Sequence, residues 1–322
     1  MQLKKLGRTG LKVSAIGIGT MFFGNTIQEA DAIKIMDMGF ENGINLIDTA
    51  NSYVGGRSEE IVGKAIKNKR HEVVLATKVA HKLGLGPNDF GLSRKHIMHA
   101  VEESLRRLDT DYIDIYYAHA PDYSTPIEET LRAFDYLVQQ GKVRYIACSN
   151  FRAWQLIKAL WVSEHYNLAR FDCIQSPYNL LTRDIEYEIL PGCAAEGVGV
   201  TVYSSLAAGL LTGKYNTNIT PAPDTRFGVD KVYKERYWSH INFQAVAHLK
   251  QIADTHSQSL TQFSLAWILN NPLISSAIIG VSSMKQLEEN IVSIDLKLTS
   301  EETKGCDEVW LELRPPRIFY GH

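Results

Sequence analysis

With 322 residues, of which 45% are hydrophobic and 22% are charged, the chain has the size and composition of a globular protein with a substantial core. Its formal net charge of −2 provides no basic field that would attract nucleic acid or an anionic membrane. No stretch approaches the roughly 20 apolar residues that a membrane helix requires. We therefore expect neither a nucleic-acid partner nor a membrane partner.

The amino terminus, MQLKKLGRTGLKVS, has basic residues but no apolar segment behind them, so it is not typical of a secretory signal. The four cysteines are widely scattered and match neither a disulfide framework nor a zinc motif. They are Cys148, Cys173, Cys193 and Cys306. These features predict a cytoplasmic protein without a bound metal.

Short apolar segments rich in β-branched residues recur along the chain, as is typical of strands buried on both faces in parallel sheets. The predicted strands are residues 15–20, 44–50, 72–78, 112–119, 143–150, 172–179, 198–205 and 276–283. Helical spacing marks 29–41, a helix opening at Ser58, 94–107, 127–140, 151–166, 185–196 and 284–291. Eight strands alternating with helices predict a (β/α)8 barrel, a TIM barrel, over residues 1–322 as one domain. A doubly wound sheet is the alternative.

Three segments depart from this alternation. Between the seventh and eighth strands we expect a loop at 216–240 and helices at 241–256 and 261–270. Long loops in compact domains usually serve function, so 207–240 is a candidate flap over a ligand. The segment LKKLGRTGLKVS predicts a hairpin that closes the bottom of the barrel. A capped helix at 299–312 precedes the tail RPPRIFYGH.

The predicted strands end in polar side chains, and active sites of such barrels lie at the carboxyl-terminal face. The residues at these ends are Asp48, Lys78, His119, Ser149, Asn150, Gln175, Tyr203, Ser204 and Ser282. Buried strands seldom finish in ionisable groups by accident. We therefore expect the functional site at this end of the barrel.

Three of these residues, together with Tyr53 in the loop after the second predicted strand, suit carbonyl reduction. This reaction needs a proton donor for the oxygen and groups that stabilise the developing alkoxide. A tyrosine has an ordinary pKa of about 10, and a neighbouring ammonium makes the phenol more acidic. A carboxylate can hold that ammonium, and a histidine can orient the carbonyl by a hydrogen bond. Tyr53, Lys78, Asp48 and His119 supply these groups.

Around these residues the sequence closely resembles the aldo-keto reductase superfamily. The resemblance covers nearly the whole chain, in order, through GINLIDTANSYVGGRSEEIVGKAI, VVLATK, YIDIYYAHAPD, GKVRYIACSN, QSPYNLL, VYSSLAAGLLTGKY and IIGVSSMKQLEENI. It implies hydride transfer between a nicotinamide cofactor and a carbonyl, with an alcohol as the product. It also implies that Tyr53 is the general acid, Lys78 its pKa-lowering partner, Asp48 the anchor of the lysine and His119 the carbonyl-orienting residue.

The resemblance further implies a cofactor site. Ser149, Asn150 and Gln175 match residues that bind the nicotinamide carboxamide, and Tyr203 matches the ring that stacks on the nicotinamide. Ser205, Leu206, Ala207, Gly209, Leu211 and Lys214 match the pyrophosphate segment, and Arg226 matches a residue that clasps the cofactor. Gly280, Ser282, Gln286, Glu289 and Asn290 match the adenosine end, while Thr20, Met21, Asp48 and Ser204 complete the expected cofactor set.

The chain departs from the family pattern at three positions. Ala120 follows the histidine where relatives often carry arginine or tryptophan, and Ser205 stands where many have proline. Gln286 replaces an arginine that reads the 2′-phosphate of NADP in some relatives. Lys214, Arg226 and Lys285 remain as cations for that phosphate. NADP is therefore favoured, and NAD is left open.

A small-molecule carbonyl or alcohol is the expected partner, and a homo-oligomer is left open. We expect Phe22, Ala120, Phe151, Trp238 and Tyr320 to line the substrate pocket, with ordinary loop packing as the alternative. No third ligand accompanies His96 and His99, which are therefore expected at the surface.

The leading hypothesis is an NADP-dependent carbonyl reductase. The first alternative is a cofactor-sensing regulatory subunit with little turnover, since some members of the superfamily report redox state to a partner. The second is a barrel lyase or isomerase that uses Lys78 as a Schiff-base nucleophile. It would leave Asp48 and the expected nicotinamide site unexplained.

Overall fold

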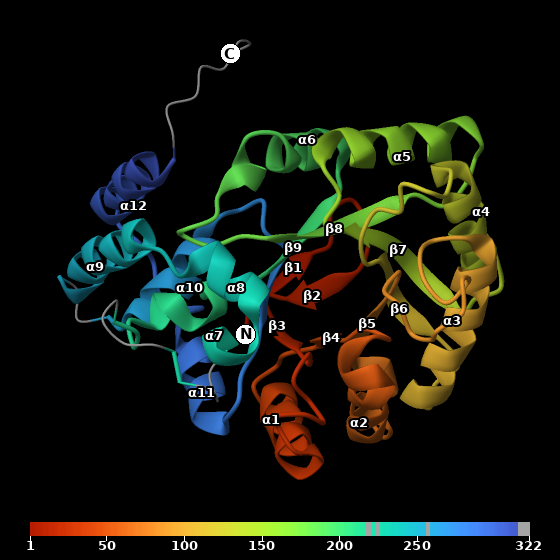
Figure 1. The fold of residues 1–322 in the computed structure, drawn as a ribbon, viewed down its shortest axis with the longest axis horizontal. Helices are drawn as coiled ribbons and strands as arrows, with labels where there is room; N and C mark the ends of the chain where they lie inside the picture. The colour runs from red at the N-terminus through yellow and green to blue at the C-terminus, as the bar shows by residue number, and fades with distance from the viewer. Residues whose placement is uncertain (217–220, 223–225, 256–257, 315–322) are drawn as a thin grey trace. The chain divides into compact units, whose positions relative to one another are not determined.

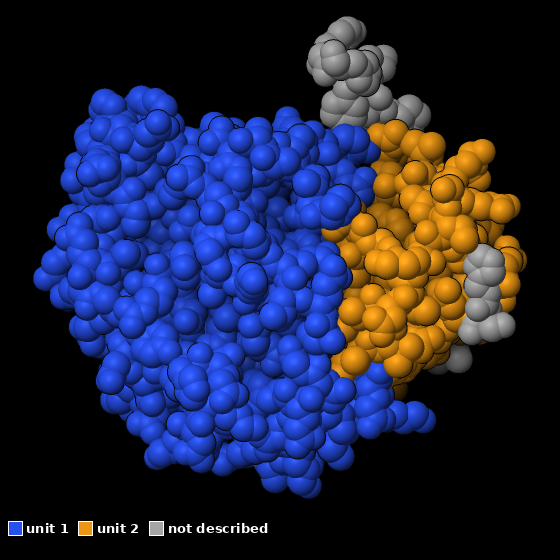
Figure 2. Space-filling model, turned by 180° about the vertical axis from the view of Figure 1, so that it is seen from behind, with its two compact units in different colours: residues 1–176, 185–203, 272–288 blue, residues 177–184, 204–271, 289–322 orange. Residues whose placement is uncertain are grey.

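The computed structural model describes residues 1–216, 221–222, 226–255 and 258–314. The chain divides into two compact units, coloured separately in Figure 2. Unit 1 consists of Met1–Ser176, Ile185–Tyr203 and Pro272–Glu288, and unit 2 consists of Pro177–Asp184, Ser204–Asn271 and Glu289–His322. Both units are discontinuous in sequence. The expectation of one domain over residues 1–322 stays a prediction.

A closed barrel of eight strands forms the centre of unit 1 (Figure 1). Around the barrel the order is β10-β3-β4-β5-β6-β7-β8-β9, and the registered pairs are parallel. The strands are β3 (Ile16–Gly19), β4 (Leu46–Asp48), β5 (Val74–Val79), β6 (Ile113–Ala118), β7 (Val143–Ser149), β8 (Phe171–Pro177), β9 (Gly199–Tyr203) and β10 (Ser276–Ile279). The predicted (β/α)8 barrel is confirmed, and each strand begins within two residues of its predicted start.

Helices follow the strands on the outside of the barrel (Figure 1). They are α1 (Glu29–Glu41), α2 (Arg57–Ile66), α3 (Arg94–Leu108), α4 (Ile127–Gln139), α5 (Ala153–His165) and α6 (Ile189–Glu196). The short 3-10 helices are η1 (Tyr53–Gly56), η2 (Arg70–Glu72) and η3 (Asp184–Glu186). Every residue of β5 is buried, so this strand is covered on both faces, which agrees with its mainly apolar sequence.

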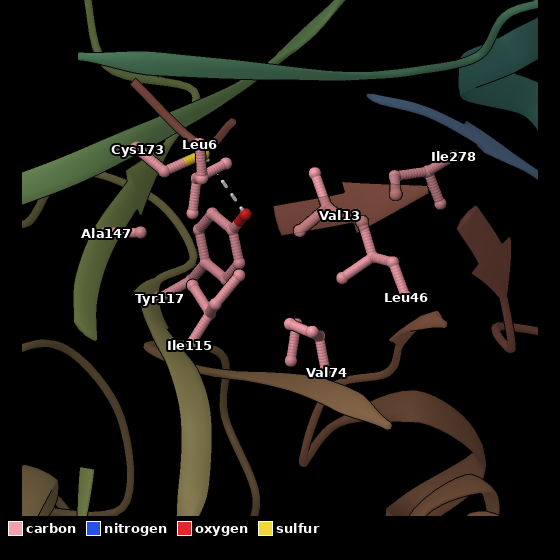
Figure 3. Close-up of a cluster of buried hydrophobic side chains, with 10 residues drawn as sticks. Leu6, Val13, Leu46, Val74, Ile115, Tyr117, Ala147, Cys173 and Ile278 are labelled. Carbon is pink, nitrogen blue, oxygen red and sulfur yellow. Dashed lines mark hydrogen bonds between the residues drawn. The ribbon is translucent and has the colours of Figure 1, made fainter. Parts of the chain in front are cut away.

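The predicted amino-terminal hairpin is present as β1 (Leu3–Lys5) and β2 (Lys12–Ser14), which pair antiparallel. Leu6 and Val13 are fully buried and belong to the same core cluster as Leu46 and Val74, the first residues of β4 and β5 (Figure 3). Parallel strands begin at the same end of a barrel, so the hairpin closes the amino-terminal end. The carboxyl-terminal end is the one that carries the polar strand ends.

Unit 2 is built mainly from helices. They are η4 (Ala207–Thr212), α7 (Arg226–Val229), α8 (Lys231–Tyr237), α9 (His240–Asp254), α10 (Leu260–Asn270) and α12 (Ser300–Leu313). Helix α11 (Met284–Val292) begins in unit 1 and ends in unit 2. None of the helices in the described part of the chain has the length and apolar character needed to cross a bilayer.

The expectation of a loop over 216–240 was wrong, because α7 and α8 lie in this segment. The Asp230 carboxylate caps α8 by accepting the backbone N–H groups of Val232 and Tyr233. The rings of Phe227 and Trp238 pack together with centroids 5.1 Å apart. Helices this short show too few turns for a hydrophobic period to be recognised.

The expectation that His96 lies at the surface was also wrong. Its side chain is buried, whereas His99 is exposed. His96 lies in the buried face of α3 near Asp89, in the loop that follows β5. Burial lowers the pKa of His96, and the Asp89 carboxylate opposes that shift only in part.

Candidate active site

A buried ion pair lies at the carboxyl-terminal ends of β4 and β5. The Lys78 Nζ is 2.5 Å from Asp48 Oδ1 and also donates to the Thr49 carbonyl at 2.7 Å. The Lys78 side chain is fully buried, and that of Asp48 is 4% exposed. Burial alone would lower the pKa of Lys78, but the Asp48 carboxylate and Tyr53 outweigh it and raise that pKa. Lys78 is therefore an ammonium at neutral pH.

Tyr53 reaches this ammonium from η1, the short helix after β4. Its ring centroid lies 5.1 Å from the Lys78 Nζ, and Tyr53 helps to raise the pKa of Lys78. The chain then turns through Val54, Gly55 and Gly56, which all have positive φ, of 51°, 62° and 93°. This left-handed turn directs the chain from β4 into α2 and leaves the phenol at the mouth of the barrel.

His119 follows β6 and completes the group of four. Its ring centroid is 6.0 Å from that of Tyr53 and 4.2 Å from that of His81. Burial, with help from the Lys78 ammonium and His81, lowers the pKa of His119 well below its ordinary value. The imidazole is therefore neutral at pH 7. Its Nδ1 is buried and makes no hydrogen bond with the described residues.

Ser149 and Gln175 are registered opposite one another on β7 and β8. Gln175 Nε2 donates to Asp48 Oδ2 at 2.8 Å, and its Oε1 accepts no hydrogen bond from the described residues. Ser149 Oγ accepts from Asn150 Nδ2 at 3.1 Å, and nothing in the described part of the chain accepts its hydroxyl hydrogen. One donor and one acceptor thus remain, which is what a primary carboxamide requires.

Asn150, in contrast, uses its side-chain amide for hydrogen bonds within the protein. Its Nδ2 donates to the His119 carbonyl at 2.9 Å and to Ser149, while its Oδ1 accepts from the Tyr203 hydroxyl at 2.7 Å. Its φ of 63° places it in the left-handed region, which asparagine tolerates better than most residues. Asn150 therefore holds the end of β7 against its neighbours and orients the Tyr203 ring.

Thr20 and Met21 follow β3. The Thr20 hydroxyl is buried and bonds to the Ser58 hydroxyl at 2.8 Å, so it is occupied within the protein. Met21 is 41% exposed. Of the two, only Met21 presents its side chain to solvent.

The expected pyrophosphate segment begins in unit 2 immediately after β9. Ser204, Ala207 and Ala208 have positive φ, as do Gly209 and Gly213. Ser205, Ala207 and Leu211 are buried, Leu206 is half-buried, and the Lys214 ammonium lies 5.0 Å from the Tyr215 ring centroid. Arg226 begins α7.

The expected adenosine residues fall in both units. In unit 1, Gly280 is exposed, and the Ser282 N–H and hydroxyl both donate to Gln286 Oε1, at 2.9 and 3.0 Å, before α11. In unit 2, Glu289 accepts from the Ser259 hydroxyl at 2.9 Å, and Asn290 is buried.

The expected substrate-pocket residues are distributed over both units of the chain. In unit 1, Phe22 and Ala120 are half-buried after β3 and β6, and Phe151 is buried against Phe171, with centroids 5.7 Å apart. In unit 2, Trp238 belongs to the aromatic cluster of α7 and α8. Tyr320 lies outside the described residues. The role of all five in a pocket stays a prediction.

The structure adds residues to the site that the sequence did not reveal. His81 contacts His119, and the Thr49 carbonyl binds Lys78. Asn51 is fully buried, and both polar atoms of its side chain make no hydrogen bond with the described residues. Ser58 and Glu59, expected only to open a helix, are fully buried. Across the described chain, no three His, Cys, Asp or Glu side chains are arranged to hold a metal ion.

A (β/α)8 barrel with a buried Lys–Asp pair, a tyrosine and a neutral histidine at its carboxyl-terminal end defines a barrel protein equipped for acid–base chemistry. The family model described as "Aldo/keto reductase family" matches residues 15–311, so the chain belongs to the aldo/keto reductase family. Membership implies oxidoreductase activity with a nicotinamide nucleotide, in agreement with the resemblance found in the sequence.

Two relatives cover most of the chain. One, from Arabidopsis thaliana, is 40% identical over 92% of both chains, and one from Oryza sativa subsp. japonica is 38% identical over 98% of both chains. Each carries the name "Probable voltage-gated potassium channel subunit beta".

Proposed function

We propose that this protein is an NADP-dependent reductase that reversibly converts aldehydes or ketones into alcohols, with Tyr53 as general acid. The observation that carries the proposal is the position of the Tyr53 ring, whose centroid lies 5.1 Å from the buried Lys78 ammonium. Because an ammonium favours the phenolate over the phenol, it makes the tyrosine a stronger proton donor.

Each of the four residues has one task in the proposed reaction. Tyr53 donates its proton to the carbonyl oxygen, and Lys78 stabilises the phenolate that remains. Asp48 holds Lys78 in place and balances its charge. His119, which is neutral, orients the carbonyl through a hydrogen bond. When bound, reduced NADP supplies the hydride.

The free groups of Ser149 and Gln175 fit a nicotinamide. The Ser149 hydroxyl can donate to the carboxamide oxygen, and Gln175 Oε1 can accept from its NH₂ group. We assign the Tyr203 ring to the stacking contact. The remaining predicted cofactor residues, including those of unit 2, stay proposals.

Preference for NADP over NAD is part of the proposal. Lys285 is exposed in the first turn of α11, next to Gln286. Gln286 uses its Oε1 on Ser282. A cation beside a helix amino terminus favours an added phosphate. Fluorescence titration with NADPH and NADH tests this point, and equal affinity for both would contradict it.

The Tyr53→Phe variant tests the function. We expect NADPH affinity to stay unchanged and reduction of a probe aldehyde, 4-nitrobenzaldehyde, to be abolished, because the substitution removes only the hydroxyl group that carries the transferable proton. Tyr123→Phe is the control, since Tyr123 is 78% exposed. Retained turnover in Tyr53→Phe would refute the assignment.

A second candidate function is that of a cofactor-sensing regulatory subunit. The names of the two relatives favour it, because a channel β subunit acts through a partner protein. Measured turnover separates the candidates. A regulatory subunit would bind NADPH tightly but reduce a panel of aldehydes and ketones too slowly to matter. The Schiff-base alternative is disfavoured, because the raised pKa of Lys78 leaves little of the neutral amine that it needs.

We further propose a cytoplasmic location and a small-molecule carbonyl or alcohol as substrate. The four cysteines are free and buried, and burial raises the pKa of each thiol. Such thiols are poorly reactive, which suits a reducing compartment.

A further inference from the structure

The proposed proton donor stands on a turn that is not stable by itself. Tyr53 is separated from α2 by Val54, Gly55 and Gly56, all in the left-handed region. Valine is β-branched and is rarely found there, so neighbouring structure must hold the turn in place. Ser58 and Glu59, which follow Arg57 in the first turn of α2, are both fully buried.

Ser58 connects the start of α2 to two barrel strands. Its hydroxyl donates to the Thr20 carbonyl at 2.8 Å and lies within 2.8 Å of Thr20 Oγ1 and 3.0 Å of Thr49 Oγ1. Thr20 follows β3, and Thr49 follows β4. The Thr49 carbonyl in turn accepts a hydrogen bond from Lys78. One hydroxyl group therefore links the turn that carries Tyr53 to the residue that binds its lysine.

Glu59 connects the same helical turn to the next strand and the next helix. Its Oε1 accepts from the Thr77 hydroxyl at 2.6 Å, and its Oε2 accepts from Arg107 Nε at 2.7 Å. Thr77 directly precedes Lys78 on β5. Arg107 lies on α3, and its side chain is 11% exposed.

Arg107 also supports the turn itself. A Cβ atom added to Gly56 would come within 2.7 Å of Arg107 Cδ, so the arginine stem lies directly against the last residue of the left-handed turn. The Glu59–Arg107 pair is therefore in contact with both catalytic elements: the Gly56 end of η1 and the Thr77 position of β5.

We propose that Ser58 and Glu59 are positioning residues that fix the Tyr53 hydroxyl against the Lys78 ammonium. This inference rests on the proposed function. The two side chains act through Tyr53 and Lys78 and do not touch substrate. Their hydrogen bonds hold the first turn of α2 against the ends of β3 and β4 and against β5. The left-handed turn then places the phenol of Tyr53 in one position. Without these hydrogen bonds, the Tyr53 phenol shifts away from the Lys78 ammonium and becomes a weaker acid.

Glu59→Gln and Ser58→Ala test the proposal, with Glu60→Gln as the matched control. Glu60 is the next residue of α2, and its carboxylate pairs with Arg57 at the surface, at 2.6 Å. For Glu59→Gln and Ser58→Ala we expect kcat for 4-nitrobenzaldehyde to fall about 10- to 100-fold, because small misplacements of catalytic groups cost rates of this order. NADPH affinity and KM should change less than about twofold. The control should retain the wild-type kcat.

The pH dependence of kcat separates positioning from general stability. Among the described residues, the charged or titratable groups near Tyr53 include Lys78 from β5 and His119 after β6, with Asp48 behind Lys78 and His81 beside His119. Loss of the ammonium contact moves the high-pH limb of the profile to higher pH. If the two residues serve only stability, the variants should unfold at a lower midpoint, while the folded variants keep the wild-type kcat and the wild-type high-pH limb. That result would overturn the proposal.

Two further variants keep the result interpretable. If Glu59→Gln does not fold, Ser58→Ala decides, because it removes a single hydroxyl and no charge. The double variant Glu59→Gln/Arg107→Met removes both buried charges, and we expect it to recover the unfolding midpoint but not kcat. Recovery of kcat would overturn the proposal. If Tyr53→Phe is fully active, the proposed function itself fails. If Tyr53→Phe is inactive but Glu59→Gln and Ser58→Ala are fully active, this inference alone fails.

Discussion

Gln175 donates a side-chain N–H to the Asp48 carboxylate at 2.8 Å, although 127 positions separate the two residues in the chain. The other oxygen of Asp48 binds Lys78. One buried carboxylate therefore joins the proposed nicotinamide site to the proposed proton donor. A substitution at Gln175 should affect both sites, because it leaves the buried Asp48 carboxylate without one of its hydrogen-bond donors, and an unsatisfied buried acceptor costs free energy.

Replacement of Gln175 by leucine should weaken NADPH binding and also slow turnover. We expect the dissociation constant for NADPH to rise about tenfold, which corresponds to the loss of one buried hydrogen bond. Fluorescence titration measures it. Gln139→Leu is the control, because Gln139 donates to Asp135 on the exposed side of α4. Wild-type affinity in Gln175→Leu would remove Gln175 from the cofactor site.

Asp48→Asn should destabilise the protein strongly. It leaves the fully buried Lys78 without its counter-ion, and breaking a buried pair in this way costs about 3–5 kcal/mol. Urea unfolding measures the change. Asp31→Asn removes a pair in which both side chains are more than 60% exposed, so it should cost less than about 1 kcal/mol. Similar losses in both variants would contradict the assigned burial.

The stability of the protein should fall as the pH is lowered through the ordinary histidine pKa of about 6.5. The pKa of His119 is lowered well below that value by burial, Lys78 and His81, so the unfolded chain binds a proton there that the folded chain does not. Stability is therefore lost as pH falls, by about 1.4 kcal/mol per pH unit for one such group. His119→Gln should reduce this slope. Equal slopes in wild type and His119→Gln would contradict the prediction.

Val54→Gly should stabilise the folded state. Val54 has a φ of 51° and is 36% exposed, so the substitution relieves strain without emptying the core. Left-handed backbone costs a β-branched residue about 1–2 kcal/mol, and the flexibility of glycine in the unfolded chain offsets part of the gain. We expect a net increase of about 0.5–1 kcal/mol in the unfolding free energy. A decrease would show that the Val54 side chain makes contacts that outweigh its strain.

The barrel could be predicted because most residues of its strands are buried, so that the strands read as short, mainly apolar segments. Asp48, Lys78 and His119 interrupt or end such sequences, and parallel strands place their carboxyl ends together. Their proximity therefore followed from the fold alone. Tyr53 is not on a strand, and the resemblance was needed to select it from the 15 tyrosines of the chain.

The residues that the sequence did not reveal are those whose burial or contacts depend on the tertiary structure. Ser58 and Glu59 have the composition of an ordinary helix start, and only the structure shows them buried between strands. His81 belongs to no motif, since its contact with His119 depends on the path of the loop after β5. His96 was misplaced because that same loop, near Asp89, covers one end of α3. Tertiary contacts of loops are not encoded in local periodicity.

The most direct test of the central claim is the pH dependence of kcat in the wild type and in Lys78→Met, measured with NADPH and 4-nitrobenzaldehyde. If the ammonium makes the phenol acidic, removal of the ammonium should lower kcat and move the high-pH limb toward the ordinary tyrosine pKa of about 10. An unchanged limb, with folding and NADPH binding intact, would show that Lys78 does not tune the proton donor.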